Sequence, residues 1–306
     1  MTGAPGERAW LRRGEIRPRR GWGQCFLINA RIPERLVAGW NLDAGTGVLE
    51  IGAGAGALTL PLLARGLSVV AVERDARLCE LLRERAAVAG LPGTLRVVGG
   101  DILTLSPAAV LAATGAAPGP APEPECWVVV GNLPYAITSP ILGWAVRHRR
   151  WFAWAALMMQ REVAARLLAG PDSSNYGSLT VWVGYHFRVE KEMAVGAANF
   201  WPMPKVESAV VRLRPHAAPP VEVPSARALE RVVRAAFSHR RKMIAGSLSR
   251  GMEAERAAVE GALREAGIDP RRRAESCTLE EFAALTRRLW AAGVTGGRGA
   301  GEGEEA

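Results

Sequence analysis

The sequence predicts an α/β protein in which a largely parallel sheet, covered on both faces by helices, is followed by a small all-helical domain. Three observations predict this class. Short apolar segments alternate with helical patterns from about residue 47, and strands buried on both faces have this continuous apolar character. A proline-rich stretch at residues 217–224 marks a boundary. Beyond that stretch only helical patterns follow.

The strands expected in the sheet are short apolar runs. They are residues 47–51, 67–72, 95–98, 126–130 and 154–159, with a further strand at 208–214. The segment between the second and third runs, residues 76–88, carries Leu78, Leu81 and Leu82 at helical spacing, and we expect a helix there. A strand, a helix and a strand in this order are typical of a parallel sheet.

The chain is expected to have four parts. These are a flexible basic N-terminus at residues 1–21, a first domain at 22–216, a helical domain at 217–292 and a disordered tail at 293–306. The helices expected in the helical domain are residues 225–250, 253–266 and 279–290. Ser225 is the expected N-cap of the first of them. Residues 113–125 are rich in Pro and Ala, and this composition predicts a surface loop.

The charge of the chain favours a polyanionic partner. Its 306 residues carry a net charge of +9, with a pI near 10.2, as many nucleic-acid-binding proteins do. The excess lies near the two ends. Residues 1–21 hold six Arg against two Glu, a net of +4, and residues 217–292 hold 14 basic and 10 acidic groups, also +4. Charge that serves only solubility is the alternative interpretation.

The composition argues against several other classes of protein. No run of ~20 apolar residues would cross a membrane, and no apolar segment near the start predicts secretion, so we expect a cytoplasmic protein. The four cysteines (Cys25, Cys79, Cys126 and Cys277) form no CxxC pair, and the four histidines do not cluster with them. We therefore expect neither a metal site nor a disulfide framework.

A glycine-rich turn, Gly52–Ala57, follows the first strand. Glycines let the backbone turn tightly and approach a ligand at a helix N-terminus, so Gly52 and Gly54 are candidate contacts. The run also fits the dinucleotide fingerprint and does not by itself distinguish two cofactor classes. Acidic residues follow the next two strands. Glu73 is placed to accept ribose hydroxyls and Asp101 an adenine amine. A solvated strand end for Glu73 and an N-cap for Asp101 are credible alternatives singly, but less so when both acids follow successive strands of one sheet.

The fourth strand leads into Asn132-Leu133-Pro134-Tyr135. The exocyclic amine of adenine is a poor nucleophile, because its lone pair is delocalised into the ring. A site that methylates it needs acceptors for both amine hydrogens, and the Asn132 side-chain oxygen and the Leu133 carbonyl supply them. Pro134 stiffens the turn, and Tyr135 offers a ring on which an unstacked base can lie. These four residues are the candidate reacting site, with a simple strand-ending turn as the alternative.

With these residues in place the chain resembles the ribosomal small-subunit RNA adenine dimethyltransferases, the kasugamycin-sensitivity family of 16S rRNA enzymes. The resemblance extends from about Arg19 to Leu289. The motifs that carry it are GQCFL (Gly23–Leu27), LEIGAGAGALT (Leu49–Thr59), NLPYAITSPIL (Asn132–Leu142), FWPMPKVESAVVRL (Phe200–Leu213), FSHRRKMI (Phe237–Ile244) and AGIDPRRRAESCTLEEF (Ala266–Phe282).

The resemblance implies a Rossmann-like S-adenosylmethionine-dependent methyltransferase sheet with a small C-terminal all-helical domain. Residues 22–216 would then be the methyltransferase domain. It further implies that methyl groups pass from S-adenosylmethionine to the N6 atoms of two adjacent adenines, in a hairpin loop near the 3′ end of 16S rRNA. The expected partner is this RNA within a small ribosomal subunit or its precursor, and the chain is expected to be a monomer.

The resemblance also implies roles for individual residues. The residues expected to contact the cofactor are Leu27, Gly52, Glu73, Asp101 and Asn132. Cys25 stands where relatives usually carry Asn or His, which leaves a backbone contact to the cofactor but puts a side-chain role in doubt. Phe200 would lie beside the target base, with core packing as the alternative. Arg240, Arg241 and Lys242 would pair with RNA phosphates, or form a solvated face.

Three other functions stay open at this point. One is the related adenine methyltransferase of 23S rRNA that confers macrolide resistance, against which the long C-terminal match argues. Another is a non-catalytic RNA-binding assembly factor on the same fold. The intact candidate reacting site argues against this function. The third is an NAD-dependent oxidoreductase, which the glycine turn alone would permit.

Overall fold

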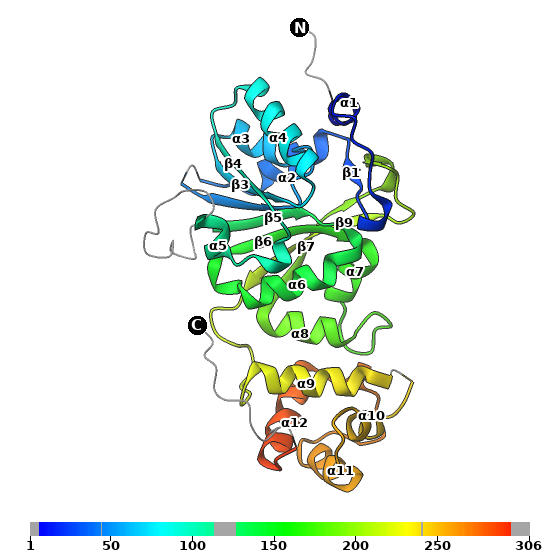
Figure 1. Ribbon diagram of the computed structural model, residues 1–306. Coiled ribbons are helices and arrows are strands. Elements are labelled where there is room, and N and C mark those ends of the chain that lie inside the picture. Colours follow the sequence, from blue (N-terminus) through cyan, green and yellow to red (C-terminus); the bar gives the residue numbers. More distant parts are fainter. Residues whose placement is uncertain (1–5, 44, 113–126, 240, 295–306) are drawn as a thin grey trace. The chain divides into compact units, whose positions relative to one another are not determined.

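The computed structural model describes residues 6–43, 45–112, 127–239 and 241–294 (Figure 1). The chain divides into two compact units. The first contains the residues up to Ala164 together with Arg188–Pro215, and the second contains Ala165–Phe187 and the residues from His216 onward. The chain therefore crosses between the units three times. Each unit is described separately below.

The described residues of the first unit form a seven-stranded sheet in the order β4-β3-β2-β5-β6-β9-β7 (Figure 1). Its strands are β2 (Gly47–Ile51), β3 (Ser68–Glu73), β4 (Thr94–Gly99), β5 (Trp127–Asn132), β6 (Trp154–Gln160), β7 (Phe187–Val195) and β9 (Ser208–Pro215). Neighbouring strands from β4 to β6 are parallel, and β9 is antiparallel to β6. The predicted α/β class, with a helical C-terminal region, is confirmed.

Strand β7 was not among the expected strands. Its sequence, FRVEKEMAV, has four charged residues, and its burial alternates poorly because only Phe187 and Val195 at its ends are buried. Such a strand lies at the edge of the sheet, where one side of the backbone needs no partner strand and polar side chains reach solvent. An apolar-run criterion therefore misses it.

Helices cover both faces of the sheet (Figure 1). Those on one face are α2 (Arg31–Gly39), α3 (Thr59–Ala64) and α4 (Ala76–Ala89), and those on the other include α5 (Pro107–Ala112) and α6 (Thr138–Arg147). Helix α4 begins at Asp75, whose side chain accepts a hydrogen bond from the Arg77 backbone N–H at 3.2 Å. It ends at Gly90, which has a left-handed φ of 57°.

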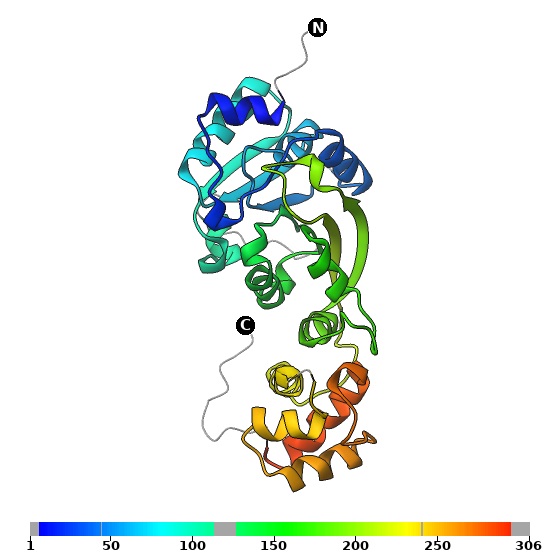
Figure 2. The same cartoon turned by 90° about the vertical axis from the view of Figure 1, so that its right-hand side faces the viewer.

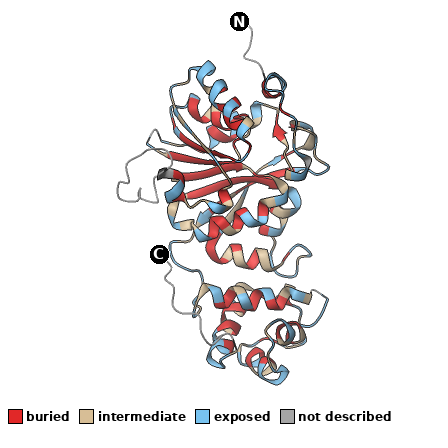
Figure 3. Ribbon diagram, viewed as in Figure 1, coloured by how far each residue is buried: buried red, intermediate tan, exposed pale blue. Residues whose placement is uncertain are grey.

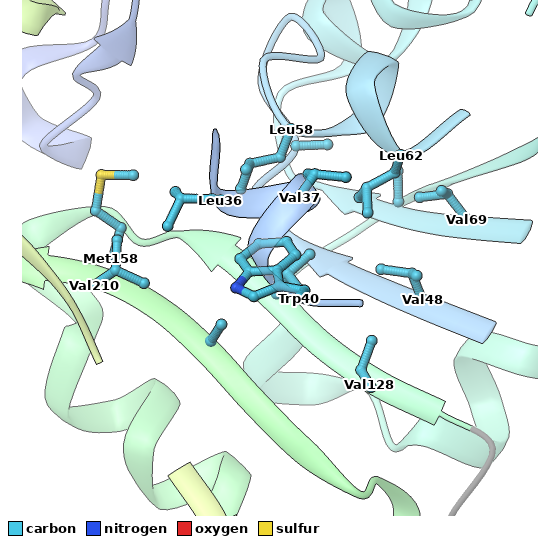
Figure 4. Close-up of a cluster of buried hydrophobic side chains, with 14 of the residues drawn as sticks. Leu36, Val37, Trp40, Val48, Leu58, Leu62, Val69, Val128, Met158 and Val210 are labelled. Atoms are coloured by element: carbon cyan, nitrogen blue, oxygen red, sulfur yellow. The ribbon is translucent and has the colours of Figure 1, made fainter. Parts of the chain in front are cut away.

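The main core of this unit lies between the sheet and the helices α2, α3 and α4. Figure 4 shows Trp40 near Val48 and Val128, with Leu62 next to Val69. Alternate residues of each strand point to this face, since successive side chains in a strand alternate. The other residues of β2 and β3, apart from the exposed Ser68, are buried as well (Figure 3). Burial on both faces explains why most residues of these strands are apolar.

The N-terminal segment corrects a prediction. We expected residues 1–21 to be flexible, but Glu7–Arg13 form helix α1, in which Trp10 is 5% exposed and Leu11 fully buried. These side chains pack with Leu78 and Leu81 of α4. Their spacing places them on one helix face with Glu7. The prediction of flexibility rested on the number of arginines, and that number does not reveal a short amphipathic helix.

A two-stranded ribbon completes the first unit. Strand β1 (Phe26–Leu27) pairs antiparallel with β8 (Phe200–Trp201), in the register Phe26 to Trp201 and Leu27 to Phe200. Two segments that are far apart in the sequence, both of them family motifs, are thereby joined beside the sheet (Figure 2).

The second unit is helical. Its main helices are α8 (Ser178–His186), α9 (Ala226–Ala236), α10 (Ile244–Gly251), α11 (Arg256–Glu265) and α12 (Leu279–Ala291). Ser225 caps α9 as predicted, accepting a hydrogen bond from the Ala228 N–H at 3.1 Å. Two expectations differ from the structure. Residues 165–187 belong to this unit and not to the first, because α8 packs on α9.

The second difference is that residues 225–250 are not one helix. The α-helix ends after Ala236, a short 3-10 turn at Phe237–His239 follows, and α10 starts at Ile244. Ser238 donates a hydrogen bond to the Ala235 carbonyl at 2.7 Å. Such local side-chain bonds compete with helix continuation.

Some predictions lie outside the described residues. They concern the loop at residues 113–125, the side chain of Arg240 and the tail from residue 295. Among the helices in the described parts of the chain, none is both long and apolar enough to span a bilayer.

Candidate active site

One pocket brings together most of the predicted site residues. It lies where β2, β3, β4 and β5 end, and it includes the position between β2 and β5 at which the strand order reverses. Ligands of open α/β sheets bind at this position. The predicted residues that line it are Cys25, Leu27, Gly52, Gly54, Glu73, Asp101, Asn132, Leu133 and Pro134. Tyr135 and Phe200 do not line it.

The glycine turn has a backbone that only glycines adopt without strain. Gly54 and Gly56 have φ values of 57° and 98°. A Cβ at Gly56 would lie 2.7 Å from a methyl carbon of Leu82 on α4. The turn therefore packs closely against α4 and presents its other side to the pocket.

Glu73 ends β3 and is 7% exposed, which excludes the solvated strand end. One carboxylate oxygen accepts the Gly54 N–H at 2.9 Å, and the other accepts the Asp75 N–H at 2.9 Å. Burial raises the pKa of Glu73, and these backbone hydrogen bonds oppose the rise. Each oxygen keeps a lone pair after these bonds. Glu73 therefore holds the turn and can still accept a ligand hydroxyl.

Asp101 caps a turn and still faces the pocket. One of its oxygens accepts the Leu103 N–H at 3.0 Å and caps the 3-10 turn Ile102–Thr104. The other lies 3.4 Å from a guanidinium nitrogen of Arg74. With 26% of the side chain exposed, the carboxylate stays accessible from the pocket and can also accept an amine hydrogen.

Asn132 is held in one orientation. Its side-chain NH2 group donates to the Cys25 carbonyl at 3.1 Å, which leaves the amide oxygen as the free end. The neighbouring Leu133 N–H donates to Met158 at 2.9 Å. From the described part of the chain no hydrogen bond reaches the Asn132 side-chain oxygen or the Leu133 carbonyl. The two acceptors required for an amine are present and unbonded.

The same contact gives Cys25 a role that its side chain does not carry. The atom that fixes Asn132 is the backbone carbonyl of Cys25, and any residue at this position supplies that carbonyl. Burial raises the pKa of the Cys25 thiol, so the thiol stays neutral. The replacement of the usual Asn or His by Cys therefore leaves this contact intact.

Tyr135 and Phe200 lie beyond the pocket wall. The Tyr135 hydroxyl bonds the Ser208 hydroxyl at 2.7 Å, and its ring is partly exposed. The Phe200 side chain is 2% exposed and belongs to the hydrophobic core. The core packing weighed as an alternative is what the structure shows for Phe200, because its strand is paired with the buried Leu27.

Several residues that line the pocket were missed. Glu50 is 2% exposed, and its carboxyl accepts the Thr59 hydroxyl at 2.6 Å. Burial raises the pKa of Glu50 to about 8, against the opposing effect of the Thr59 bond. A single acid inside the otherwise apolar strand GVLEI was the signal available. At the pocket rim the Arg19 and Arg74 guanidinium groups lie over the Trp22 ring, 4.4 and 4.7 Å from its centroid.

The pocket fits a cationic nucleoside better than a dinucleotide. A dinucleotide would place its pyrophosphate on free N–H groups of the glycine turn, yet the Gly54 N–H is already bonded to Glu73. The carboxyl groups of Glu73 and Asp101 also line the pocket, and they disfavour a phosphate but suit a sulfonium ion. These residues therefore fit S-adenosylmethionine.

The fold and this site define the class of the Rossmann-like S-adenosylmethionine-dependent methyltransferases. Within that class the chain belongs to the ribosomal RNA adenine dimethylase family, which matches residues 16–290. It is 40% identical to the ribosomal RNA small subunit methyltransferase A of Geobacter sulfurreducens over 284 residues, 92% of this chain and 99% of the relative. It is 42% identical to the protein of the same name from Anaeromyxobacter dehalogenans strain 2CP-C, over 93% of this chain and 98% of the relative.

Two solved structures are similar over most of the chain. A dimethyladenosine transferase from Plasmodium falciparum matches with a TM-score of 0.70 and 25% identity, over 88% of this chain and 98% of that one. The 23S rRNA methyltransferase ErmE matches with a TM-score of 0.62 and 32% identity, over 86% and 99%. The chain is thus an enzyme of the rRNA adenine dimethyltransferase type, with S-adenosylmethionine as methyl donor.

Proposed function

We propose that the enzyme converts two adjacent adenines, in a hairpin loop near the 3′ end of 16S rRNA, to N6,N6-dimethyladenine during small-subunit assembly. The relatives named as small-subunit methyltransferases support the choice of RNA, since they match nearly the whole chain. The observation that carries the chemistry is the pair of unbonded acceptors, the Asn132 side-chain oxygen and the Leu133 carbonyl, in the wall of a pocket that fits the donor.

The two acceptors make the amine of adenine nucleophilic. In the first transfer each acceptor binds one amine hydrogen, which draws the nitrogen lone pair out of the ring system; in the second transfer the one remaining hydrogen binds one of the two acceptors. The bound donor supplies an electrophilic methyl group on a sulfonium. The methylated amine cation is itself acidic, so the site needs no strong base. Asn132 and Leu133 contribute by orientation and electrostatics, which lower the barrier without any proton transfer to the protein.

The target base must leave its stack to reach this wall. Tyr135 follows the two acceptors after Pro134, and its hydroxyl is fixed by Ser208, which is fully buried. A fixed and partly exposed ring next to the acceptors offers a surface for the base, worth ~1–3 kcal/mol. That is comparable to the few kcal/mol that unstacking costs. Phe200 would join it only by leaving the core.

The basic segments are proposed to hold the RNA backbone. Arg12 of α1 and the described pair Arg241 and Lys242 are exposed, and exposed basic groups of this kind neutralise phosphates. A chain that works on a ribosomal subunit would act in the cytoplasm, and we propose that it does so as a monomer.

Product analysis tests the proposal. Small subunits isolated from a strain without this methylation would be incubated with the enzyme and labelled S-adenosylmethionine, with large subunits as the matched control. We expect label only in the small-subunit RNA, with N6,N6-dimethyladenine at adjacent positions identified by mass spectrometry. Label in the large subunit, or on another base, would contradict the proposed substrate.

A further inference from the structure

Helix α1 presents two different faces. Its outward side chains are Arg8, Arg12 and Arg13, which are exposed. Its inward side chains are Glu7, Trp10 and Leu11, which are at most 7% exposed. The two apolar residues pack in one cluster with Phe26, Ala55 and two leucines of α4. Because Ala55 lies in the glycine turn, α1 contacts the backbone segment that forms the donor side of the pocket.

A buried ion pair fastens this contact. Glu7 of α1 pairs with Arg85 of α4, and the two residues are 7% and 9% exposed. Burial raises the pKa of Glu7, and the charge of Arg85 lowers it. A charge so deeply buried is strongly destabilising without its partner. Arg85 therefore needs Glu7, and Glu7 is in place only when α1 is docked.

Arg85 also reaches the glycine turn. The guanidinium nitrogen that meets Glu7 also donates to the Ala55 carbonyl at 2.7 Å. The residue before Ala55 is Gly54, whose N–H is held by Glu73. Two side chains thus fix successive residues of the turn from different sides. A turn built on glycines has a flexible backbone, and such external bonds determine its conformation.

We propose that helix α1 is a positioning element of the S-adenosylmethionine site, in which Glu7 orients Arg85 and Arg85 holds the Ala55 carbonyl of the turn on which the donor lies. The inference rests on the proposed function only for the identity of the ligand. Glu7 also lines the pocket, so the helix closes one side of it. Docking of α1 and binding of the donor then favour one another, as two linked equilibria must.

Two variants separate this role from simple packing. Glu7→Gln removes the charge that orients Arg85 but keeps its shape, and Arg85→Lys keeps the charge but loses the planar fork. The matched control is Glu84→Gln. Glu84 precedes Arg85 on α4 and also pairs with α1, through Arg13 at 2.9 Å, but both side chains are exposed and neither contacts the turn. Calorimetry would measure the Kd of S-adenosylhomocysteine for the wild-type enzyme and these three variants.

We expect Glu7→Gln and Arg85→Lys each to raise this Kd at least about fivefold, the lower limit of typical coupling between sites. Glu84→Gln should leave it within twofold of the wild-type value. In methyl-transfer assays the KM for the donor should rise, with kcat at saturating donor little changed, because the lost interaction affects binding of the donor in its ground state.

A second measurement uses the unmodified protein and does not depend on how the variants fold. Hydrogen exchange of residues 7–16 would be followed with and without S-adenosylhomocysteine. If docking of α1 and binding of the donor are coupled, S-adenosylhomocysteine should slow hydrogen exchange in α1. The factor by which exchange slows should equal the factor by which docking of α1 lowers the Kd of the ligand. Exchange in α12, which belongs to the second unit, serves as the internal control and should not change.

The outcomes are distinct. Variants that lower the Tm but keep the wild-type Kd, or a ligand that leaves exchange in α1 unchanged, would overturn the positioning role and return α1 to a stabilising helix. If the wild-type protein bound no S-adenosylhomocysteine at all, the donor assignment in the proposed function would fail instead. Only a raised Kd together with slower exchange supports the proposal.

Discussion

The two walls of the pocket differ in how their polar groups are used. On the donor wall, Glu73 bonds two backbone N–H groups, Asp101 caps a turn and Arg85 bonds the glycine turn. On the acceptor wall, the Asn132 side-chain oxygen and the Leu133 carbonyl have no hydrogen bond from the described residues. Changes in the donor wall should therefore affect stability and affinity together, whereas changes in the acceptor wall should affect catalysis while the fold stays intact.

The largest expected effect is that of Asn132→Ala. The variant loses the acceptor that polarises the target amine, and removing one preorganised group of this kind costs on the order of 10²–10³ in kcat. It also loses the bond to Cys25, worth only about 1 kcal/mol. We expect a much lower rate of methyl transfer to small subunits even at saturating S-adenosylmethionine, and a nearly unchanged Tm. A near-normal rate would mean that the amine is not activated at this wall.

Glu73→Ala should affect both properties in the same variant. Loss of hydrogen bonds between a charged carboxylate and a ligand hydroxyl costs ~1.5–3 kcal/mol, or about 10- to 100-fold in affinity. The N–H groups of Gly54 and Asp75 lose their partner as well, which should lower the free energy of unfolding by ~1–3 kcal/mol for each. Calorimetry with S-adenosylhomocysteine and urea unfolding measure the two effects.

NAD is the control ligand for this experiment. The wild-type enzyme should not bind it, because the turn N–H that a pyrophosphate would need is already bonded to Glu73. Tight NAD binding with no response to S-adenosylhomocysteine would contradict the choice of donor.

Glu50 gives the donor wall a pH dependence. Its pKa is raised from 4.5 to about 8, so the folded state holds a proton that the unfolded state releases. Stability should therefore fall as the pH rises between about 4.5 and about 8, with Glu50 contributing at most ~1.4 kcal/mol per pH unit. In Glu50→Gln, which keeps an acceptor for Thr59, this fall should be shallower. The raised pKa values of Glu7 and Glu73 act in the same direction in both proteins.

Urea unfolding at several pH values within this window would show the difference between the two proteins. Parallel curves for the wild-type enzyme and Glu50→Gln would mean that Glu50 is not the group that titrates. A constant vertical displacement between such parallel curves would reflect a change in packing, and only a shallower slope for Glu50→Gln supports titration of Glu50.

The sequence predicted the two walls more accurately than the segments that support them. The glycine turn and the acids Glu73 and Asp101 can be found because each follows an apolar strand, and parallel strands end at one edge of the sheet. The ion pair of Glu7 and Arg85 joins residues 78 positions apart. Neither residue stands out locally, since acidic and basic residues are common on helices, and their burial depends on the docking of α1.

Other differences have similar causes. Strand β7 was missed because an edge strand keeps its charged residues. Residues 165–187 were placed in the wrong unit because the sequence of a helix does not show which element it packs against. Phe200 was assigned to the target base from the resemblance, and that role stays a prediction; its pairing with β1 is a long-range contact that no local pattern shows. In each case the missing information is the tertiary environment of the residues, which a local sequence pattern does not contain.

The smallest effect tests what Tyr135, which follows the acceptor wall in sequence but does not line the pocket, contributes to binding of the substrate. Tyr135→Phe keeps the ring and loses only the hydroxyl bond to Ser208, so the KM for small subunits should change less than about threefold, a fraction of the ~1–3 kcal/mol that stacking supplies. Tyr135→Ala loses the ring itself and should raise that KM by about 5- to 100-fold on the same scale.

Ser208→Ala removes the same hydrogen bond from the other side. If this bond only orients the ring, the double variant Tyr135→Phe/Ser208→Ala should be no worse than the single ones, since partners in one contact are not additive. Additive losses would show that the hydroxyl contacts the RNA directly, and Tyr135 would then recognise the substrate by more than stacking.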